Sequence, residues 1–274
     1  LFFALFGTCF MRRSRIILYI ILLAVFSFGA YAAFMYVYTE WKFLPVELLQ
    51  EPSAQAPHSE WKATDDLLYI HKVNTPRRAE NKDESYDGYE LDIQTDSQGN
   101  LAIAHDEDDL ADGIKLADIF SSVDNPSEKS YWLDLKTELT EKQLDQIVLT
   151  AQAFGIPKEH LLLESVPGPT AKLINKKGLG LLLQVPEDFD KDGGNPQKRK
   201  ELNEALLKQW QEYKPAAASA SFGKYPYLRA YFPLMPKAIY YSSTVRPSLK
   251  KPFMTDHMEE DPSVKIFMLD EYTW

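Results

Sequence analysis

The sequence predicts an α/β fold, a (β/α)8 TIM barrel preceded by an N-terminal transmembrane helix. Eight short apolar runs alternate with helical or loop segments from residue 65 onward, and strands that alternate with helices form parallel sheets. Eight strands in about 210 residues suit a closed barrel better than a doubly wound sheet. No glycine-rich phosphate loop follows any of these runs, which counts against the nucleotide-binding folds.

The predicted strands are short, mostly apolar runs. The eight barrel strands are LLYIH (67–71), YELDI (89–93), YWLDLK (131–136), LLLES (161–165), GLLLQV (180–185), AAASASF (216–222), KAIYYS (237–242) and KIFMLD (265–270). LAIAH (101–105) follows YELDI after a polar turn, and we expect it to form an extra hairpin arm.

Three helices are predicted between the strands. Thr140 and Gln143 have capping-box spacing at the start of a helix over 140–155, which Gly155 ends. The apolar stripe of that helix is Leu144, Ile147, Val148 and Ala151. A second helix, over 195–214, begins with Asn195 and Pro196. Its predicted buried residues are Leu202, Leu206, Trp210 and Tyr213. A shorter helix over 168–178 ends at Gly178.

The N-terminal part contains an uncharged apolar run from Ile16 to Tyr38. A run of roughly 20 apolar residues crosses the hydrocarbon core as a helix. Arg12, Arg13 and Arg15 precede it and predict a cytoplasmic N-terminus, with the rest of the chain on the periplasmic or extracellular side. A cleaved signal peptide is the alternative, because Ala30-Tyr31-Ala32 resembles a cleavage site. The apolar run continues past that site, which favours an uncleaved anchor.

The chain is therefore divided into four predicted parts. They are a cytoplasmic N-terminus (1–15), a transmembrane anchor (16–38), a proline-containing linker (39–64) and the barrel (65–274). Met11 directly before the arginines indicates that residues 1–10 are an upstream misreading of the start.

The composition excludes several classes of function. The 274 residues carry a formal net charge of −10, which argues against nucleic-acid partners because phosphates need a basic surface. The single cysteine, Cys9, lies ahead of the predicted barrel. Disulfides within the chain are therefore impossible, and a zinc site with cysteine ligands is disfavoured.

Charged and imidazole side chains gather where the predicted strands end, which is where barrel enzymes carry their active sites. The candidates are His71, Glu90, Asp92, His105, Asp134, Lys136 and Glu164. Crowded carboxylates need either a raised pKa or a cation, and oxygen ligands suit Mg²⁺ or Ca²⁺. A divalent cation, a lysine and two histidines that exchange protons at neutral pH are suited to cleaving a phosphodiester.

The stretch HKVNTPRRAEN…YELDIQTDSQGNLAIAHD resembles the opening of the glycerophosphodiester phosphodiesterase-like barrels, and YWLDLK resembles their next motif. The H-x-x-N form of His71 to Asn74 is nearer to the sphingomyelinase/phospholipase D toxin branch and to menorin-like proteins. The resemblance makes His71 and His105 the acid/base pair and places Lys136 beside the phosphate. It makes Glu90, Asp92 and Asp134 the metal ligands.

The same resemblance implies substrate contacts from Lys72 and Asn74 and attack by a neighbouring hydroxyl of the substrate, which gives a cyclic phosphate. This sequence departs from the family pattern in three ways. Lys72 replaces the common arginine, which exchanges a bidentate phosphate clamp for a single contact. Asp134 is shorter than the common glutamate. The helix usual between Glu80-Asn81 and Glu90 is nearly absent.

The loop after the seventh predicted strand, YYSSTVRPS, lies where barrels often bind phosphate. A solvated loop is the favoured interpretation of this segment, and in the alternative Arg246 contacts the phosphate. The acidic run DEDDLAD (106–112) is predicted to be an exposed loop. His58, His160 and His257 have no predicted role.

Together these features predict a single-pass membrane enzyme that cleaves phosphodiesters such as glycerophosphodiesters or lysophospholipids, as a hydrolase or as a lyase. The first alternative is a non-catalytic cell-surface barrel that binds a ligand or partner. The second is a glycosidase with paired carboxylates about 5 to 9 Å apart, a reading that leaves both histidines unexplained.

Overall fold

The computed structural model describes residues 17–34, 68–80, 86–186, 196–241 and 258–269. The chain separates into two compact units. One contains Leu1–Leu44 and Pro247–His257, and the other contains Pro45–Arg246 and Met258–Trp274. The predicted linker lies outside the described residues, as do residues 1–10.

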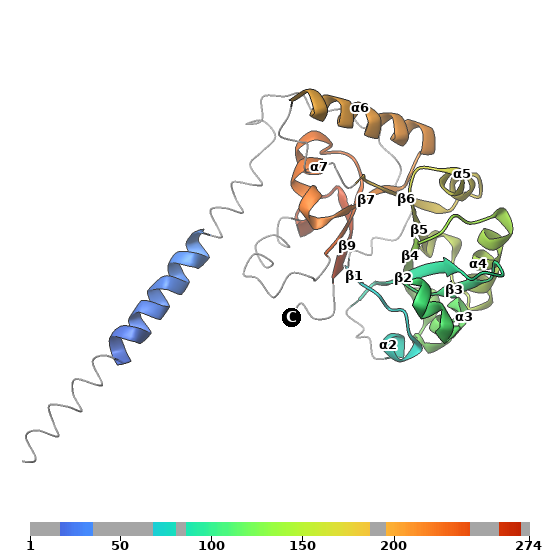
Figure 1. Ribbon diagram of the computed structural model, residues 1–274, viewed down its shortest axis with the longest axis horizontal. Helices are drawn as coiled ribbons and strands as arrows, with labels where there is room; N and C mark the ends of the chain where they lie inside the picture. The colour runs from blue at the N-terminus through green and yellow to red at the C-terminus, as the bar shows by residue number, and fades with distance from the viewer. Residues whose placement is uncertain (1–16, 35–67, 81–85, 187–195, 242–257, 270–274) are drawn as a thin grey trace, which may run out of the picture. The chain divides into compact units, whose positions relative to one another are not determined.

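The first unit contains the N-terminal helix Ile17–Phe34, drawn in blue in Figure 1. Its 18 residues give a length of about 27 Å, close to the thickness of a bilayer core. Length and composition make this helix able to cross a membrane, and a signal sequence meets the same two criteria. Residue 16 and residues 35–38 of the predicted anchor are outside the described part of the chain.

The second unit is a closed barrel of eight parallel strands, as the sequence predicts (Figure 1). The strands run in the order β1-β2-β4-β5-β6-β7-β8-β9, and β9 pairs with β1 to close the barrel. Their bounds are β1 Leu68–Ile70, β2 Gly88–Thr95, β4 Ser130–Leu135, β5 Leu161–Ser165, β6 Gly180–Gln184, β7 Ala217–Ser221, β8 Lys237–Tyr240 and β9 Val264–Leu269. β3, Leu101–Ile103, pairs antiparallel with β2 as the predicted hairpin arm.

Helices surround the barrel. They are α2 Pro76–Glu80, α3 Leu116–Ser122, α4 Glu141–Ala153, α5 Pro169–Lys176, α6 Pro196–Tyr213 and α7 Tyr225–Tyr231. The acidic run that follows His105 forms an exposed 3-10 helix, Glu107–Asp112. Sequence patterns do not predict α3 and α7, because each has only 7 residues and two turns show no clear period.

The three predicted helices form with the expected ends. Thr140 accepts a hydrogen bond from the Gln143 backbone in a capping box, and Gly155 and Gly178 have the positive φ angles that helix ends require. On α4 the predicted stripe faces inward, with Val148 half-buried. On α6, Leu206, Trp210 and Tyr213 are buried and Leu202 is half-buried. Asn195 lies outside the described residues.

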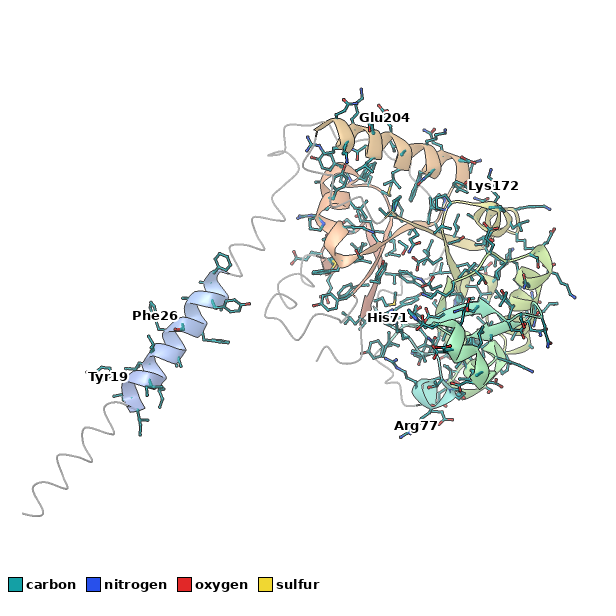
Figure 2. The ribbon with its side chains drawn as sticks, viewed as in Figure 1. Tyr19, Phe26, His71, Arg77, Lys172 and Glu204 are labelled. Atoms are coloured by element: carbon teal, nitrogen blue, oxygen red, sulfur yellow. The ribbon has the colours of Figure 1, made fainter. Side chains whose placement is uncertain are left out.

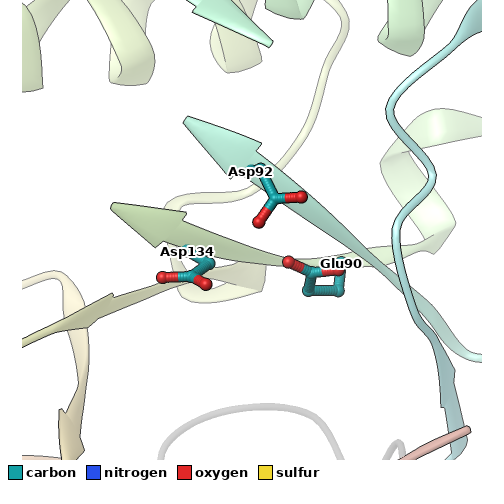
Figure 3. Close-up of side chains that lie close together, drawn as sticks. All are labelled: Glu90, Asp92 and Asp134. Carbon is teal, nitrogen blue, oxygen red and sulfur yellow. The ribbon is translucent and has the colours of Figure 1, made fainter. Parts of the chain in front are cut away.

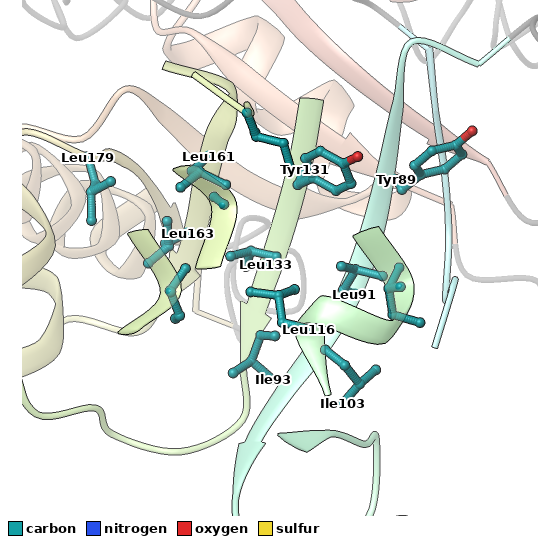
Figure 4. Packing of buried hydrophobic residues seen from close by; sticks show 14 of the residues in the cluster. Tyr89, Leu91, Ile93, Ile103, Leu116, Tyr131, Leu133, Leu161, Leu163 and Leu179 are labelled. Carbon is teal, nitrogen blue, oxygen red and sulfur yellow. The ribbon is translucent and has the colours of Figure 1, made fainter. Parts of the chain in front are cut away.

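Alternation along each strand separates two apolar clusters. The cluster inside the barrel consists of Tyr69, Trp132, Leu162, Leu182, Ala217, Ala238, Ile266 and Met268. The neighbouring strand residues face outward into a larger cluster shared with α3, α4 and α5 (Figure 4). Strands buried on both faces explain why the sequence reads as continuous apolar runs. The apolar interior leaves only the ends of the barrel for polar chemistry.

At the N-terminal end of the strands, Lys237 begins β8 and is fully buried. Its ammonium group donates hydrogen bonds to the carbonyls of Phe232 and Met235 at 3.0 and 2.9 Å and to Ser263 Oγ at 2.6 Å. Burial lowers the pKa of Lys237 to about 8, although Asp261 acts in the opposite direction.

Lys237 makes the stability of the barrel depend on pH. The folded pKa of about 8 lies below the ordinary 10.5, so the unfolded chain binds more protons between these values and the free energy of unfolding rises with pH there. Between pH 7.5 and 9.5, we expect the free energy of unfolding of the wild type, measured with urea, to rise by about 2 kcal/mol more than that of Lys237→Met. Parallel pH profiles for the two proteins would contradict this reading.

Candidate active site

Three carboxylates converge at the C-terminal ends of β2 and β4. Glu90 and Asp92 lie two residues apart on β2 and therefore point to the same face, into the barrel. The parallel register sets Asp134 of β4 directly beside Asp92. One oxygen from each of the three side chains lies within 4.8 Å of the others (Figure 3). Glu90 and Asp92 are buried, and Asp134 is partly exposed.

Lys136 places an ammonium group between two of these acids. Its Nζ atom lies 2.7 Å from Asp92 Oδ1 and 2.5 Å from Asp134 Oδ2. Lys136 follows Asp134 by two residues, and the backbone N–H of Lys136 donates to the carbonyl of Ile93 on β2. The pairing of β2 and β4 thus continues to the residue that carries the positive charge.

The loop after β1 donates hydrogen bonds to Glu90 and Asp92. Lys72 adopts a left-handed backbone conformation, with a φ of 57°, and its N–H donates to Glu90 Oε2 at 2.6 Å. Such a conformation costs a non-glycine residue about 1–3 kcal/mol. Asn74 Nδ2 donates to Asp92 Oδ2 at 2.6 Å, and Asn74 Oδ1 accepts from the Asp92 N–H at 3.0 Å. Asn74 therefore orients a carboxylate, and its predicted contact with substrate stays a prediction.

Burial and mutual repulsion control the protonation of the cluster. Burial raises the pKa of Glu90 well above its ordinary value, and the charges of Asp92 and Asp134 raise it further. Burial also raises the pKa of Asp134 despite its ion pair with Lys136. For Lys136, burial favours the neutral amine, but Asp134 and Asp92 outweigh it and the pKa is raised. The site stores unfavourable negative charge that a cation would relieve.

The donor set fits a hard divalent cation. All three groups offer carboxylate oxygens, which Mg²⁺ and Ca²⁺ prefer. Two ligands on opposite sides of a calcium ion are about 4.8 Å apart when each bond is about 2.4 Å long, and the cluster lies within that distance.

Both predicted histidines border the same cavity as the acids. His71 directly follows β1 (Figure 2), and its Nε2 atom lies 3.7 Å from Glu90 Oε2. His105 follows β3, its carbonyl accepts a hydrogen bond from Gln94 Nε2 at 2.8 Å, and its Nδ1 lies 3.1 Å from Asp106 Oδ1. The His71 side chain is 14% exposed and that of His105 is 39% exposed, so His71 is the inner of the two.

The cavity measures about 220 Å³. Its lining residues are His71, Lys72, Glu90, His105, Asp134, Lys136, Glu164, Gln184, Tyr240 and Met268. The structure therefore brings together the predicted residues of β1, β2, β4 and the hairpin arm. Arg246, His58 and His257 are outside the described residues. His160 lies at the other end of the barrel, before β5, with its Nδ1 atom 3.1 Å from the Lys129 carbonyl.

Four of the lining residues complete the site from the remaining strands. Among them, the sequence patterns single out only Glu164, as the end of its strand. Gln184, Tyr240 and Met268 occupy the last inward positions of β6, β8 and β9, so strand alternation is the signal that identifies them. Burial and the charge of Asp134 raise the pKa of Glu164 to about 8.

Comparisons with known proteins support the fold. No protein-family model matches this chain, and neither does any curated protein. A solved glycerophosphodiester phosphodiesterase from Parabacteroides distasonis is similar, with a TM-score of 0.50 and 12% identity over 77% of this chain and 94% of that chain. At such identity the likeness concerns the barrel, and the nearer resemblance to the H-x-x-N branch stays a prediction.

Two other solved structures are similar at lower scores. An orotidine 5'-monophosphate decarboxylase from Sulfolobus solfataricus has a TM-score of 0.44 and 8% identity over 74% of this chain and 87% of that chain. An enolase from an alpha proteobacterium, with bound magnesium, has a TM-score of 0.42 and 11% identity over 87% of this chain and 60% of that chain.

Cation binding is testable by stability. At a concentration of Mg²⁺ or Ca²⁺ about 100 times its dissociation constant, binding to the folded state adds about 2.7 kcal/mol to the free energy of unfolding. We expect thermal unfolding of the wild type to shift upward by several degrees, and the shift to disappear in Asp134→Asn. Glu159→Gln, at an exposed position before β5, should retain the full shift. An equal shift in Asp134→Asn would exclude the carboxylate cluster as the binding site.

Proposed function

We propose that this chain is a metal-dependent phosphodiesterase that cleaves glycerophosphodiester- or lysophospholipid-type substrates. The observation that supports this proposal is the shared cavity at the C-terminal end of the barrel. That one space is bordered by two histidines, by two lysines, and by Glu90 and Asp134 of the three-carboxylate cluster. Phosphodiester cleavage needs these parts together: charge stabilisation at phosphorus and two groups that move protons.

We assign the two proton transfers to the two histidines by their positions. Both imidazoles can exchange protons at neutral pH. One histidine removes the proton from the attacking hydroxyl, and the other protonates the oxygen that leaves. His71 lies beside Glu90 of the cluster, so it is the better placed to take the proton of an attacking hydroxyl that is held near the cluster. His105 lies nearer to solvent, where a departing group leaves the site.

Lys136 and Lys72 supply positive charge to the substrate phosphate. Lys136 also keeps Asp92 and Asp134 together. Glu90, Asp92 and Asp134 would hold the divalent cation, Mg²⁺ or Ca²⁺, which would stabilise the charge that develops on the phosphoryl oxygens. Attack by a hydroxyl of the substrate itself releases a cyclic phosphate, whereas attack by water releases a phosphomonoester.

The N-terminal helix supports a membrane-anchored enzyme with its barrel on the periplasmic or extracellular side. The arginines before the helix favour a cytoplasmic N-terminus. An anchor would keep the barrel close to lipid-derived phosphodiesters. The net charge of −10 disfavours nucleic acid as the phosphodiester substrate.

Removing either imidazole should abolish most of the activity. General acid–base catalysis contributes about 10² to 10⁴-fold to a rate, so we expect His71→Ala and His105→Ala each to lower kcat by that factor. Phosphorus NMR of glycerophosphodiesters and lysophospholipids, with Mg²⁺ and with a chelator, measures the rate and identifies the product. His160→Ala is the matched control and should retain activity. A double His71/His105 variant with unchanged biological effect would favour a non-catalytic binding barrel.

The two histidines should differ in their response to the leaving group. p-Nitrophenolate is a stable anion and leaves without a proton. The variant that lacks the general acid should therefore recover much of its lost rate on a phosphodiester with a p-nitrophenyl leaving group. We expect His105→Ala to recover by about tenfold or more, and His71→Ala to remain equally impaired. Recovery by His71→Ala instead would exchange the two roles, and equal recovery by both would argue against a division of labour.

A further inference from the structure

Glu164 is a buried acid inside the barrel that does not belong to the carboxylate cluster of the described residues. It is 5% exposed and lies on β5, beside Asp134 on β4 and Leu182 on β6. Burying a carboxyl group costs free energy, and the interior cluster of the barrel consists of apolar side chains. Packing alone therefore gives no reason for an acid at this position, where it borders the cavity.

Two donors hold the carboxyl group of Glu164 in one orientation. Trp132 Nε1 donates to Oε2 at 2.8 Å, and Ser219 Oγ donates to Oε1 at 2.7 Å. Trp132 comes from β4 and Ser219 from β7, and both are fully buried. A carboxylate oxygen accepts two hydrogen bonds, and a protonated carboxyl group keeps a carbonyl oxygen with the same capacity. In either protonation state, at least one oxygen of Glu164 can thus accept one more hydrogen bond from a ligand without losing its support.

The cavity has two halves of different chemistry. The half formed by β1, β2, β4 and the hairpin arm carries the histidines, two acids of the carboxylate cluster (Glu90 and Asp134), Lys72 and Lys136. The half formed by β5, β6, β8 and β9 carries Glu164, Gln184, Tyr240 and Met268, and none of these described lining residues is cationic. A phosphate is attracted to the lysines of the first half. A neutral group that donates hydrogen bonds suits the second.

The cavity has a volume of about 220 Å³. A phosphate beside the lysines and a short polar arm beside Glu164 can occupy it together.

We propose that Glu164, with Gln184 on the neighbouring strand, binds a hydroxyl-bearing arm of the substrate and thereby sets its specificity. Glu164 is then a substrate-binding residue that accepts a hydrogen bond from the hydroxyl, and Trp132 and Ser219 are positioning residues for it. This inference rests on the proposed phosphodiesterase function, because it assumes that a phosphate occupies the half of the cavity with the lysines.

Binding of matched phosphomonoesters tests the inference without catalysis. sn-Glycerol 3-phosphate and 1-propyl phosphate differ only in two hydroxyl groups. Calorimetry on the full chain in detergent with Mg²⁺ should show about tenfold or tighter binding of glycerol phosphate, which corresponds to about 1.4 kcal/mol. In Glu164→Ala we expect this preference to fall to about twofold or less, because the acceptor is lost. The affinity for propyl phosphate should stay unchanged.

Glu159→Ala, an exposed glutamate that precedes the same strand at its other end, is the matched control and should retain the preference. If Glu164→Ala fails to fold, Glu164→Gln keeps a carbonyl acceptor and should retain part of the preference. Equal binding of both ligands to the wild type would overturn the inference, as would an undiminished preference in folded Glu164→Ala. Phosphoethanolamine carries an ammonium group in place of the hydroxyl groups. If the wild type bound it more tightly than glycerol phosphate, the inference would also be overturned. If neither phosphate ester binds, the proposed function fails together with the inference.

Discussion

Like charges held out of water are the constraint on which the mouth of this barrel depends. Glu90, Asp92 and Asp134 have oxygens within 4.8 Å of one another, and two of the three side chains are buried. Carboxylates so placed repel each other and lack solvation, and burial makes each more costly to ionise. The surrounding contacts compensate for this cost. Lys136 lies between Asp92 and Asp134, and the loop after β1 donates N–H groups to Glu90 and Asp92.

This compensation explains several local features that otherwise look unrelated. Lys72 adopts a left-handed conformation, and in that geometry its N–H donates to Glu90. The side-chain amide of Asn74 donates one hydrogen bond to Asp92 and accepts another from it. One ammonium group provides a single positive charge for three acids, so negative charge remains for a divalent cation to neutralise. The same feature therefore accounts for the shape of the loop, the position of the lysine and the expected cofactor.

The barrel keeps this polar site apart from its apolar interior. Inward positions deeper in the strands carry Trp132, Leu162 and Leu182, whereas the last inward positions carry Asp134, Glu164 and Gln184. The acids of the site lie on strands that are hydrogen-bonded on both sides, whereas both histidines, Lys72 and Asn74 lie in the segments that follow β1 and β3. Seven strands and the hairpin arm contribute lining residues or cluster acids through β1, β2, β4, β5, β6, β8 and β9. The two halves of the cavity then differ because different strands line them.

Local pattern was sufficient for all eight barrel strands, the hairpin arm and the shared face of Glu90 and Asp92, because alternation with a period of two is a property of neighbouring residues. It also predicted the long helices and their ends, but it missed the seven-residue helices α3 and α7, which are too short to show a period. Only the tertiary structure decided which distant side chains meet. Glu164 is 32 residues from Trp132 and 55 from Ser219, and their contact depends on the register of separate strands. Barrel closure sets that register, and no local spacing encodes it.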